Sequence, residues 1–105
     1  MAPAPLQIDT SRHGRWTVAR VRGDLDMATT PTLESRVDSV DGPLALDLSE
    51  VGFIDSTGVR ALIGCRESSD RFALVAPSAV VQRLLVLAGL TESFVTVASV
   101  ADLGT

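Results

Sequence analysis

The sequence predicts an α/β fold, in which one mixed sheet packs on helices. Three observations lead to this prediction. The chain has 105 residues, enough for one core and too few for two. Hydrophobic residues make up 46% of it, with three Phe, one Trp and no Tyr, so the core must be aliphatic. The apolar pattern gives two strands and then alternating helices and strands, an order that implies right-handed crossovers between parallel strands.

The first part of the chain is expected to form a lead-in and two strands. Residues 1–5 carry two prolines and are expected to fray. A short strand is predicted around residues 6–8. A second is predicted over residues 16–21, where β-branched and aromatic residues mix with polar ones until Gly23-Asp24 breaks the run. The pair His13-Gly14 between them is typical of a hairpin turn.

A first helix is predicted over residues 31–40, followed by a strand. Thr30 is placed to cap this helix, and Pro31 suits the first helical position because its missing N–H costs nothing there. After Gly42-Pro43, alternating leucines over residues 44–48 predict a strand with one strongly buried face.

The second half of the chain continues the alternation. Residues 72–76 are apolar throughout, which is typical of a strand covered on both faces between parallel neighbours. Pro77-Ser78 opens a further helix with apolar residues at helical spacing, and Gly89 is placed to close it with a left-handed cap. Residues 94–97 are expected to form a last strand, and residues 98–103 a short helical turn.

Charge and hydropathy argue against binding to nucleic acids or membranes. The formal net charge is −4, and no stretch gathers arginines into a stripe. Arg12, Arg15, Arg20 and Arg22 are spread among apolar residues, which is typical of solvated strand and loop faces. No apolar stretch approaches the length of a bilayer span, and the first residues do not resemble a secretory signal. We therefore expect a soluble cytoplasmic protein.

The sequence does not predict an enzyme, a cofactor or a metal site. His13 is the single histidine, and its place in a turn favours a surface residue over a catalytic base. Cys65 is the single cysteine, and its small and apolar neighbours indicate a buried helix residue. Without a phosphate-cradling glycine loop, these residues assemble no triad, metal cluster or nucleotide site.

The chemically most informative segment is residues 51–63. An apolar approach ends there at Asp55 and Ser56 and a helix begins, so one of these two side chains is expected to cap the helix. The first turn of a helix also suits a phosphate group, because it offers unpaired N–H groups and the positive end of the helix dipole. The residues alone leave plain capping and phosphorylation of Ser56 both open.

The same segment resembles a known family. The run LDLSEVGFIDSTG, from Leu46 to Gly58, resembles the central motif of the STAS family, the anti-sigma factor antagonists. The run from Gly23 to Asp26 and the helix from Ala76 to Leu90 resemble further family motifs, so the likeness covers nearly the whole chain. The resemblance implies a single STAS domain over residues 1–105, with a four- or five-stranded sheet and helices mainly on one side.

The resemblance also implies partner switching in bacterial transcription regulation. Such an antagonist binds an anti-sigma factor that is also a serine kinase, and thereby releases a sigma factor. The kinase phosphorylates the serine after the aspartate, which is Ser56 here, and a serine phosphatase removes the phosphate. The residues expected to bind the partner are Asp26, Asp55, Ser56, Thr57, Gly58 and Arg60.

The role of Arg60 and the class of STAS protein remain open at the level of sequence. Many antagonists have Gly-Leu-Gly after the serine, whereas Gly58 is followed here by Val59 and Arg60. Arg60 is therefore a candidate for pairing with a phosphate on Ser56, for altering partner choice, or for a plain solvated helix position. Short STAS domains also resemble the cytoplasmic subunit of lipid-transport ATP-binding-cassette complexes, which need no phosphorylation.

Overall fold

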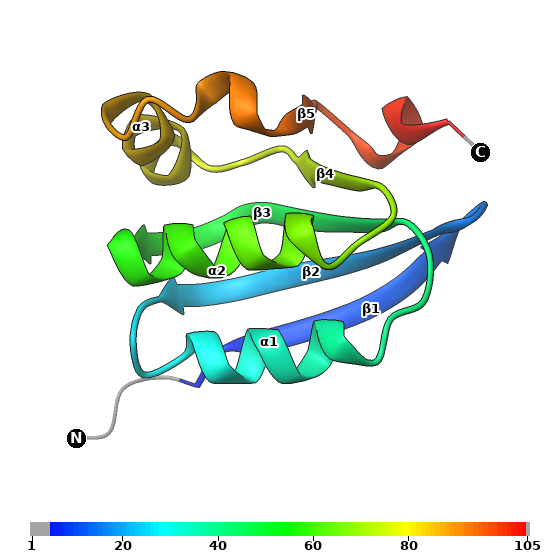
Figure 1. Cartoon of the computed structure of the whole chain (residues 1–105), viewed down its shortest axis with the longest axis horizontal. Coiled ribbons are helices and arrows are strands. Elements are labelled where there is room, and N and C mark those ends of the chain that lie inside the picture. The colour runs from blue at the N-terminus through cyan, green and yellow to red at the C-terminus, as the bar shows by residue number, and fades with distance from the viewer. Residues whose placement is uncertain (1–4, 105) are drawn as a thin grey trace.

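A five-stranded sheet forms the centre of the structure, a computed structural model in which residues 5–104 are described (Figure 1). The strands lie side by side in chain order, with β1 antiparallel to β2 and the others parallel. They are β1 (Gln7–His13), β2 (Trp16–Leu25), β3 (Leu44–Ile54), β4 (Phe72–Val75) and β5 (Val95–Val97). The predicted mixed sheet is confirmed. The lead-in expected at residues 1–5 falls, apart from Pro5, outside the described residues.

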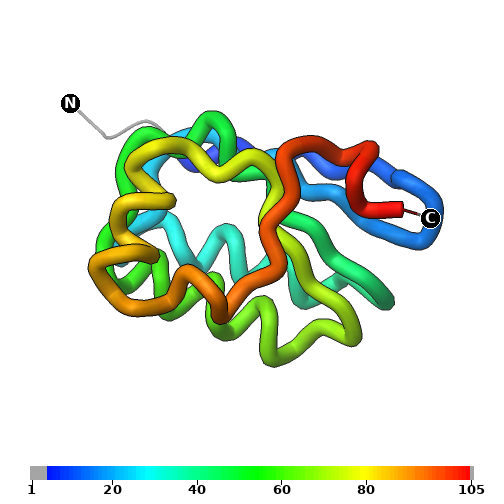
Figure 2. The backbone as a smooth tube through the Cα atoms, turned by 90° about the horizontal axis from the view of Figure 1, so that it is seen from above, coloured from blue at the N-terminus to red at the C-terminus, as the bar shows by residue number. Residues whose placement is uncertain are grey.

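Three α-helices cover one face of the sheet. They are α1 (Thr30–Asp38), α2 (Ser56–Glu67) and α3 (Ala79–Leu87), and two short 3-10 helices follow, η1 (Thr91–Ser93) and η2 (Val100–Leu103). Figure 2 shows the C-terminal segment, in red, on the side of the strands away from α1 and α2. The expectation of helices mainly on one side is confirmed.

The alternating leucines of β3 explain how the two faces differ. Leu44, Leu46 and Leu48 are fully buried in a large core beneath the helices. Ala45, between them, faces a smaller core on the other side, built with Trp16, Val18, Ala73, Val75 and Leu103. Each buried leucine contributes about 1.5–3 kcal/mol, so the helix-covered face supplies most of the stability.

Two strands extend beyond their predicted ends. β2 does not stop at Gly23-Asp24, because Gly23 has a φ of +121°, which glycine tolerates, and a shift in register lets the strand continue to Leu25. β3 continues beyond the leucines to Ile54, since its residues pair with the longer β2. Leu25 and Ile54 are therefore paired, and the two strands end side by side.

The start of α1 also differs from the prediction. The N-cap is Thr29 rather than Thr30, and the helix runs from residue 30 to 38 rather than 31 to 40. The reason lies in the preceding turn, where the Asp26 carboxylate accepts hydrogen bonds from the N–H groups of Ala28 and Thr29 at 3.0 and 3.2 Å. This turn tightens the chain before the proline, so the helix begins one residue earlier.

The remaining elements lie close to their predicted places. β1 is longer than expected and ends at His13, so the hairpin turn is Gly14-Arg15, with Gly14 at φ 58°. β4 is buried throughout, between parallel neighbours, as predicted. Ser78 is the N-cap of α3, and Gly89 has the positive φ of 71° that a left-handed helix end requires.

Cys65 is buried in the core beneath α2, as its neighbours indicate. Desolvation raises the pKa of its thiol from 9.0 to about 11, and the negative charges of Glu34 and Asp38 act in the same direction. The folded protein therefore keeps the thiol protonated at a pH where the unfolded chain has lost the proton.

This difference predicts a loss of stability at high pH. The contribution of the Cys65 thiol to the free energy of unfolding is fully present below pH 9. It declines as the pH rises toward about 11, because the unfolded state then binds fewer protons than the folded state. The chain has no lysine or tyrosine to titrate in the same window. Urea unfolding from pH 8 to 11 should show this decline in the native chain and not in Cys65→Ala. If the unfolding free energies of the native chain and of Cys65→Ala changed in parallel with pH, the raised pKa of the Cys65 thiol would be contradicted.

Candidate functional site

Asp55 caps α2 and leaves the side chain of Ser56 free. The Asp55 Oδ1 atom accepts hydrogen bonds from the N–H groups of Thr57 at 2.9 Å and Gly58 at 3.1 Å. This confirms that one residue of the Asp55–Ser56 pair caps the helix. Ser56 is the first helical residue, is exposed, and its hydroxyl makes no hydrogen bond to the described part of the chain. A reacting partner can therefore reach that hydroxyl.

The end of β2 holds the start of α2 in place. The N–H of Asp55 donates to the carbonyl oxygen of Leu25 at 3.3 Å. Gly58 packs on the same residue so closely that an added Cβ would lie 2.5 Å from the Leu25 carbonyl oxygen and 2.6 Å from Ile54 Cγ1. This close approach brings the loop that follows Leu25 next to the first turn of α2.

Asp26, in that loop, is half-buried and shapes the loop itself. Its carboxylate is occupied by the turn that precedes α1. Thr29 completes the loop, because its hydroxyl donates to the carbonyl oxygen of Asp24 at 2.6 Å and accepts from the N–H of Asp26 at 3.0 Å. Asp26 thus has a structural role in the turn, whatever it contacts beyond the chain.

The other predicted site residues differ in how far they can reach a partner. Arg60 is exposed and follows Ser56 by one helical turn, so the two side chains lie on the same face of α2. Thr57 is half-buried. Gly58 is buried and packs on Leu25, which holds the first turn of α2 against the end of β2.

Two exposed apolar side chains in the segments that adjoin the start of α2 were not predicted. Met27, in the loop after Asp26, is 76% exposed, and Phe53, two residues before Asp55, is 48% exposed. Exposed large apolar residues beside polar ones are typical of protein interaction sites. Their exposure could not be predicted from the sequence, because a methionine in a turn and a phenylalanine in an apolar run both resemble core residues. We define Met27, Phe53, Ser56 and Arg60 as the Ser56 surface.

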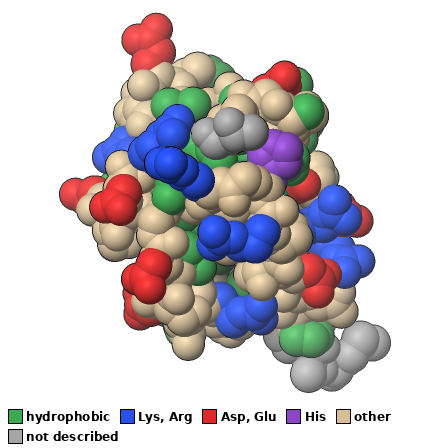
Figure 3. Space-filling model, turned by 90° about the vertical axis from the view of Figure 1, so that its right-hand side faces the viewer, with side chains coloured by type: hydrophobic (Ala, Val, Ile, Leu, Met, Phe, Trp, Pro, Cys, Tyr) green, Lys and Arg blue, Asp and Glu red, His purple; other side chains and the backbone are tan. Residues whose placement is uncertain are grey.

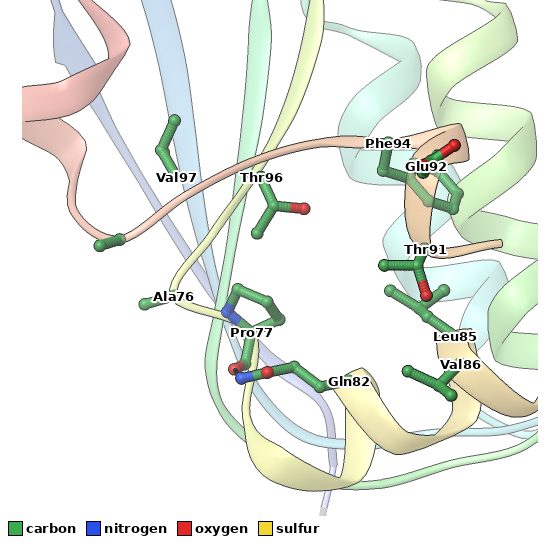
Figure 4. Close-up of a pocket in the computed structure, with 11 residues that line it drawn as sticks. Ala76, Pro77, Gln82, Leu85, Val86, Thr91, Glu92, Phe94, Thr96 and Val97 are labelled. Atoms are coloured by element: carbon green, nitrogen blue, oxygen red, sulfur yellow. Dashed lines mark hydrogen bonds between the residues drawn. The ribbon is translucent and has the colours of Figure 1, made fainter.

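A hollow of about 850 Å³ lies elsewhere, between α3 and the segment 91–98. Figure 4 shows Pro77 and Gln82 on one side of it and Thr91, Glu92 and Phe94 on another. Glu92 is its single titratable side chain, so the lining contains no pair of groups for acid–base catalysis.

Residues 5–104 contain neither a metal-binding cluster nor a helix that could cross a membrane. In this part of the chain, no three His, Cys, Asp or Glu side chains gather in a way that could hold a metal ion. None of the helices described there combines the length and the apolar character that crossing a bilayer requires.

The fold and the sequence match a known family. The model of the STAS domain family matches residues 7–103, and the chain therefore belongs to that family. The structure is similar to that of an anti-sigma factor antagonist from Mycobacterium paratuberculosis, at 29% sequence identity and a TM-score of 0.84, over 96% of this chain and 94% of that chain.

Two structures of SpoIIAA share the fold at lower identity. The anti-sigma factor antagonist SpoIIAA in its unphosphorylated form is 19% identical, with a TM-score of 0.73 and coverage of 92% of each chain. The Bacillus cell fate determinant SpoIIAA in its phosphorylated form is 18% identical, with a TM-score of 0.69, over 93% of this chain and 95% of that chain. No curated protein matches the sequence.

The contact between Gly58 and Leu25 predicts different results for two glycines of α2. Gly58→Ala should destabilise the protein by about 1–3 kcal/mol, because the new methyl group overlaps the Leu25 carbonyl oxygen. Gly64→Ala is the matched control: nothing lies within 4 Å of its added Cβ, so it should stabilise the helix by up to about 1 kcal/mol. Urea unfolding measures both. Equal effects of the same sign would show that the close approach is absent.

Proposed function

We propose that this protein is an anti-sigma factor antagonist, which binds an anti-sigma factor with serine kinase activity and is switched off by phosphorylation of Ser56. The observation that carries the proposal is the division of roles at the start of α2. Asp55 takes the capping role, and Ser56 presents an uncommitted hydroxyl to solvent. The likeness to an antagonist at 29% identity, over nearly the whole chain, supports the class of function.

A phosphate on Ser56 is compatible with the fold. It adds about 1.5–2 negative charges next to Asp55, which disfavours it, and at the N-terminus of α2, which favours it. Each effect is on the order of 1 kcal/mol, so neither threatens a domain with this core. Arg60 takes part in no ion pair with the described residues, and its guanidinium is available to pair with the phosphate.

The proposed partner contact uses the Ser56 surface. Met27 and Phe53 supply apolar area for docking, while Asp26 fixes the loop that presents Met27. Asp55, Thr57 and Gly58 hold the start of α2 in position beneath the partner. A doubly charged group at the centre of this surface would oppose a partner that docks with apolar or acidic groups, and the switch is therefore local and electrostatic.

The proposed cycle needs a serine phosphatase to restore the unphosphorylated form, and it runs in the cytoplasm, where sigma factors act. SpoIIAA, which shares this fold, has been solved in both forms, and this supports a phosphorylation cycle here. The similar structures described above are antagonists, so they favour this function over that of a lipid-transporter subunit.

Phosphorylation at one site is the direct test. We expect the protein to gain one phosphoryl group when it is incubated with its anti-sigma kinase and ATP, as measured by intact mass. Ser56→Ala should gain none, because the neighbouring Thr57 is half-buried, and Thr57→Val should behave like the native chain. Undiminished phosphorylation of Ser56→Ala would refute the assignment of the site.

A further inference from the structure

A polar cavity of about 490 Å³ lies at the opposite end of the sheet from Ser56. Its lining joins β1, β2 and the C-terminal end of α1 and consists of Thr10, Arg12, Thr17, Arg36, Ser39, Val40 and Asp41. Thr17 pairs with Leu44, the first residue of β3, whereas Ser56 follows the last. Ten strand residues separate these ends, about 33 Å at 3.3 Å per residue. The cavity is therefore separate from the Ser56 surface, and Figure 1 shows the β1–β2 hairpin and the end of α1 on the right and the start of α2 on the left.

Two arginines from different elements line this cavity. Arg12 comes from β1 and Arg36 from the last turn of α1, and neither forms an ion pair within residues 5–104. On the adjoining strand, Arg20 and Arg22 do form ion pairs, with carboxylates of β1 and β3. Figure 3 shows arginine side chains spread over this end of the molecule, beside the single histidine.

Structural roles account for only part of this arrangement. Arg36 complements the negative end of the α1 dipole. Arg12 is held in place by a hydrogen bond from its Nη1 atom to the Thr17 hydroxyl at 3.3 Å, which leaves most of its donors unused. Both side chains are exposed and form no ion pair within residues 5–104, so their guanidinium groups are available to an anion that enters the cavity.

The lining also selects the kind of anion. Guanidinium groups bind phosphate through paired N–H donors, and the hydroxyls of Thr10 and Thr17 can donate further hydrogen bonds, whereas that of Ser39 donates to the carbonyl oxygen of Arg36. The Asp41 carboxylate lies in the same lining, where it can accept a hydrogen bond from an alcohol. We propose that the cavity binds a small phosphomonoester that carries a free hydroxyl group, with the phosphoryl on Arg12 and Arg36 and the hydroxyl on Asp41. The volume lies within the usual range for small-ligand sites.

An NMR titration of the full-length chain at constant ionic strength tests this proposal, with glycerol 3-phosphate as the probe. We expect saturable shifts at the amides of Thr10, Thr17 and Ser39 and none at Ser56. Arg36→Gln and Arg12→Gln should each weaken binding at least tenfold, while the other amides show that the fold persists. Arg15→Gln removes a charge from the neighbouring turn but not from the cavity, so it should bind like the native chain.

Inorganic phosphate and lipid vesicles complete the test. Inorganic phosphate should bind more weakly than glycerol 3-phosphate, and Asp41→Asn should reduce that preference. No saturable shift, or equal losses in Arg15→Gln and Arg36→Gln, would overturn the site. Vesicles with phosphatidic acid present the same phosphomonoester on a membrane. If the protein bound these vesicles through Arg36 but did not bind glycerol 3-phosphate, the proposal of a soluble ligand would be wrong.

Discussion

The close contact between Gly58 and Leu25 determines where Ser56 lies. It presses the first turn of α2 against the end of β2, and the hydrogen bond from Asp55 to the Leu25 carbonyl oxygen fixes the same junction. Only a residue without a side chain fits there. Because β2 and β3 end side by side at this point, the loop with Asp26 and Met27 follows directly from the residue that contacts the first turn of α2.

The two neighbouring polar residues at that junction have separate roles. The Asp55 carboxylate accepts hydrogen bonds from the N–H groups of Thr57 and Gly58, and this stabilises the helix by about 1 kcal/mol. The Ser56 hydroxyl makes no hydrogen bond to the described part of the chain. A modification of its hydroxyl can therefore change what the surface binds without unfolding the domain, as a reversible switch requires. At the other end of the sheet, the cavity lined by Arg12 and Arg36 is separate from this junction.

The order of elements could be predicted from the sequence, because alternating leucines in residues 44–48, the apolar run at 72–76 and the Ser78 to Gly89 helix are local patterns. The full lengths of β2 and β3 could not, since they depend on each other's pairing and on a positive φ at Gly23. Asp55, Ser56 and Arg60 could be identified from motif and helix spacing. The exposure of Met27 and Phe53, and the meeting of Arg12 with Arg36, depend on tertiary structure, and the arginines are far apart in sequence.

We propose that one phosphate on Ser56 controls partner binding while the fold stays intact. Calorimetric titration of the anti-sigma factor with the unmodified protein and with the purified Ser56 phosphoprotein tests it most directly, together with the unfolding free energy of both forms. We expect the phosphoprotein to bind at least about tenfold more weakly, or by 1.4 kcal/mol, and the unfolding free energies of the two forms to agree within about 1 kcal/mol. Equal affinities of the two forms would contradict it.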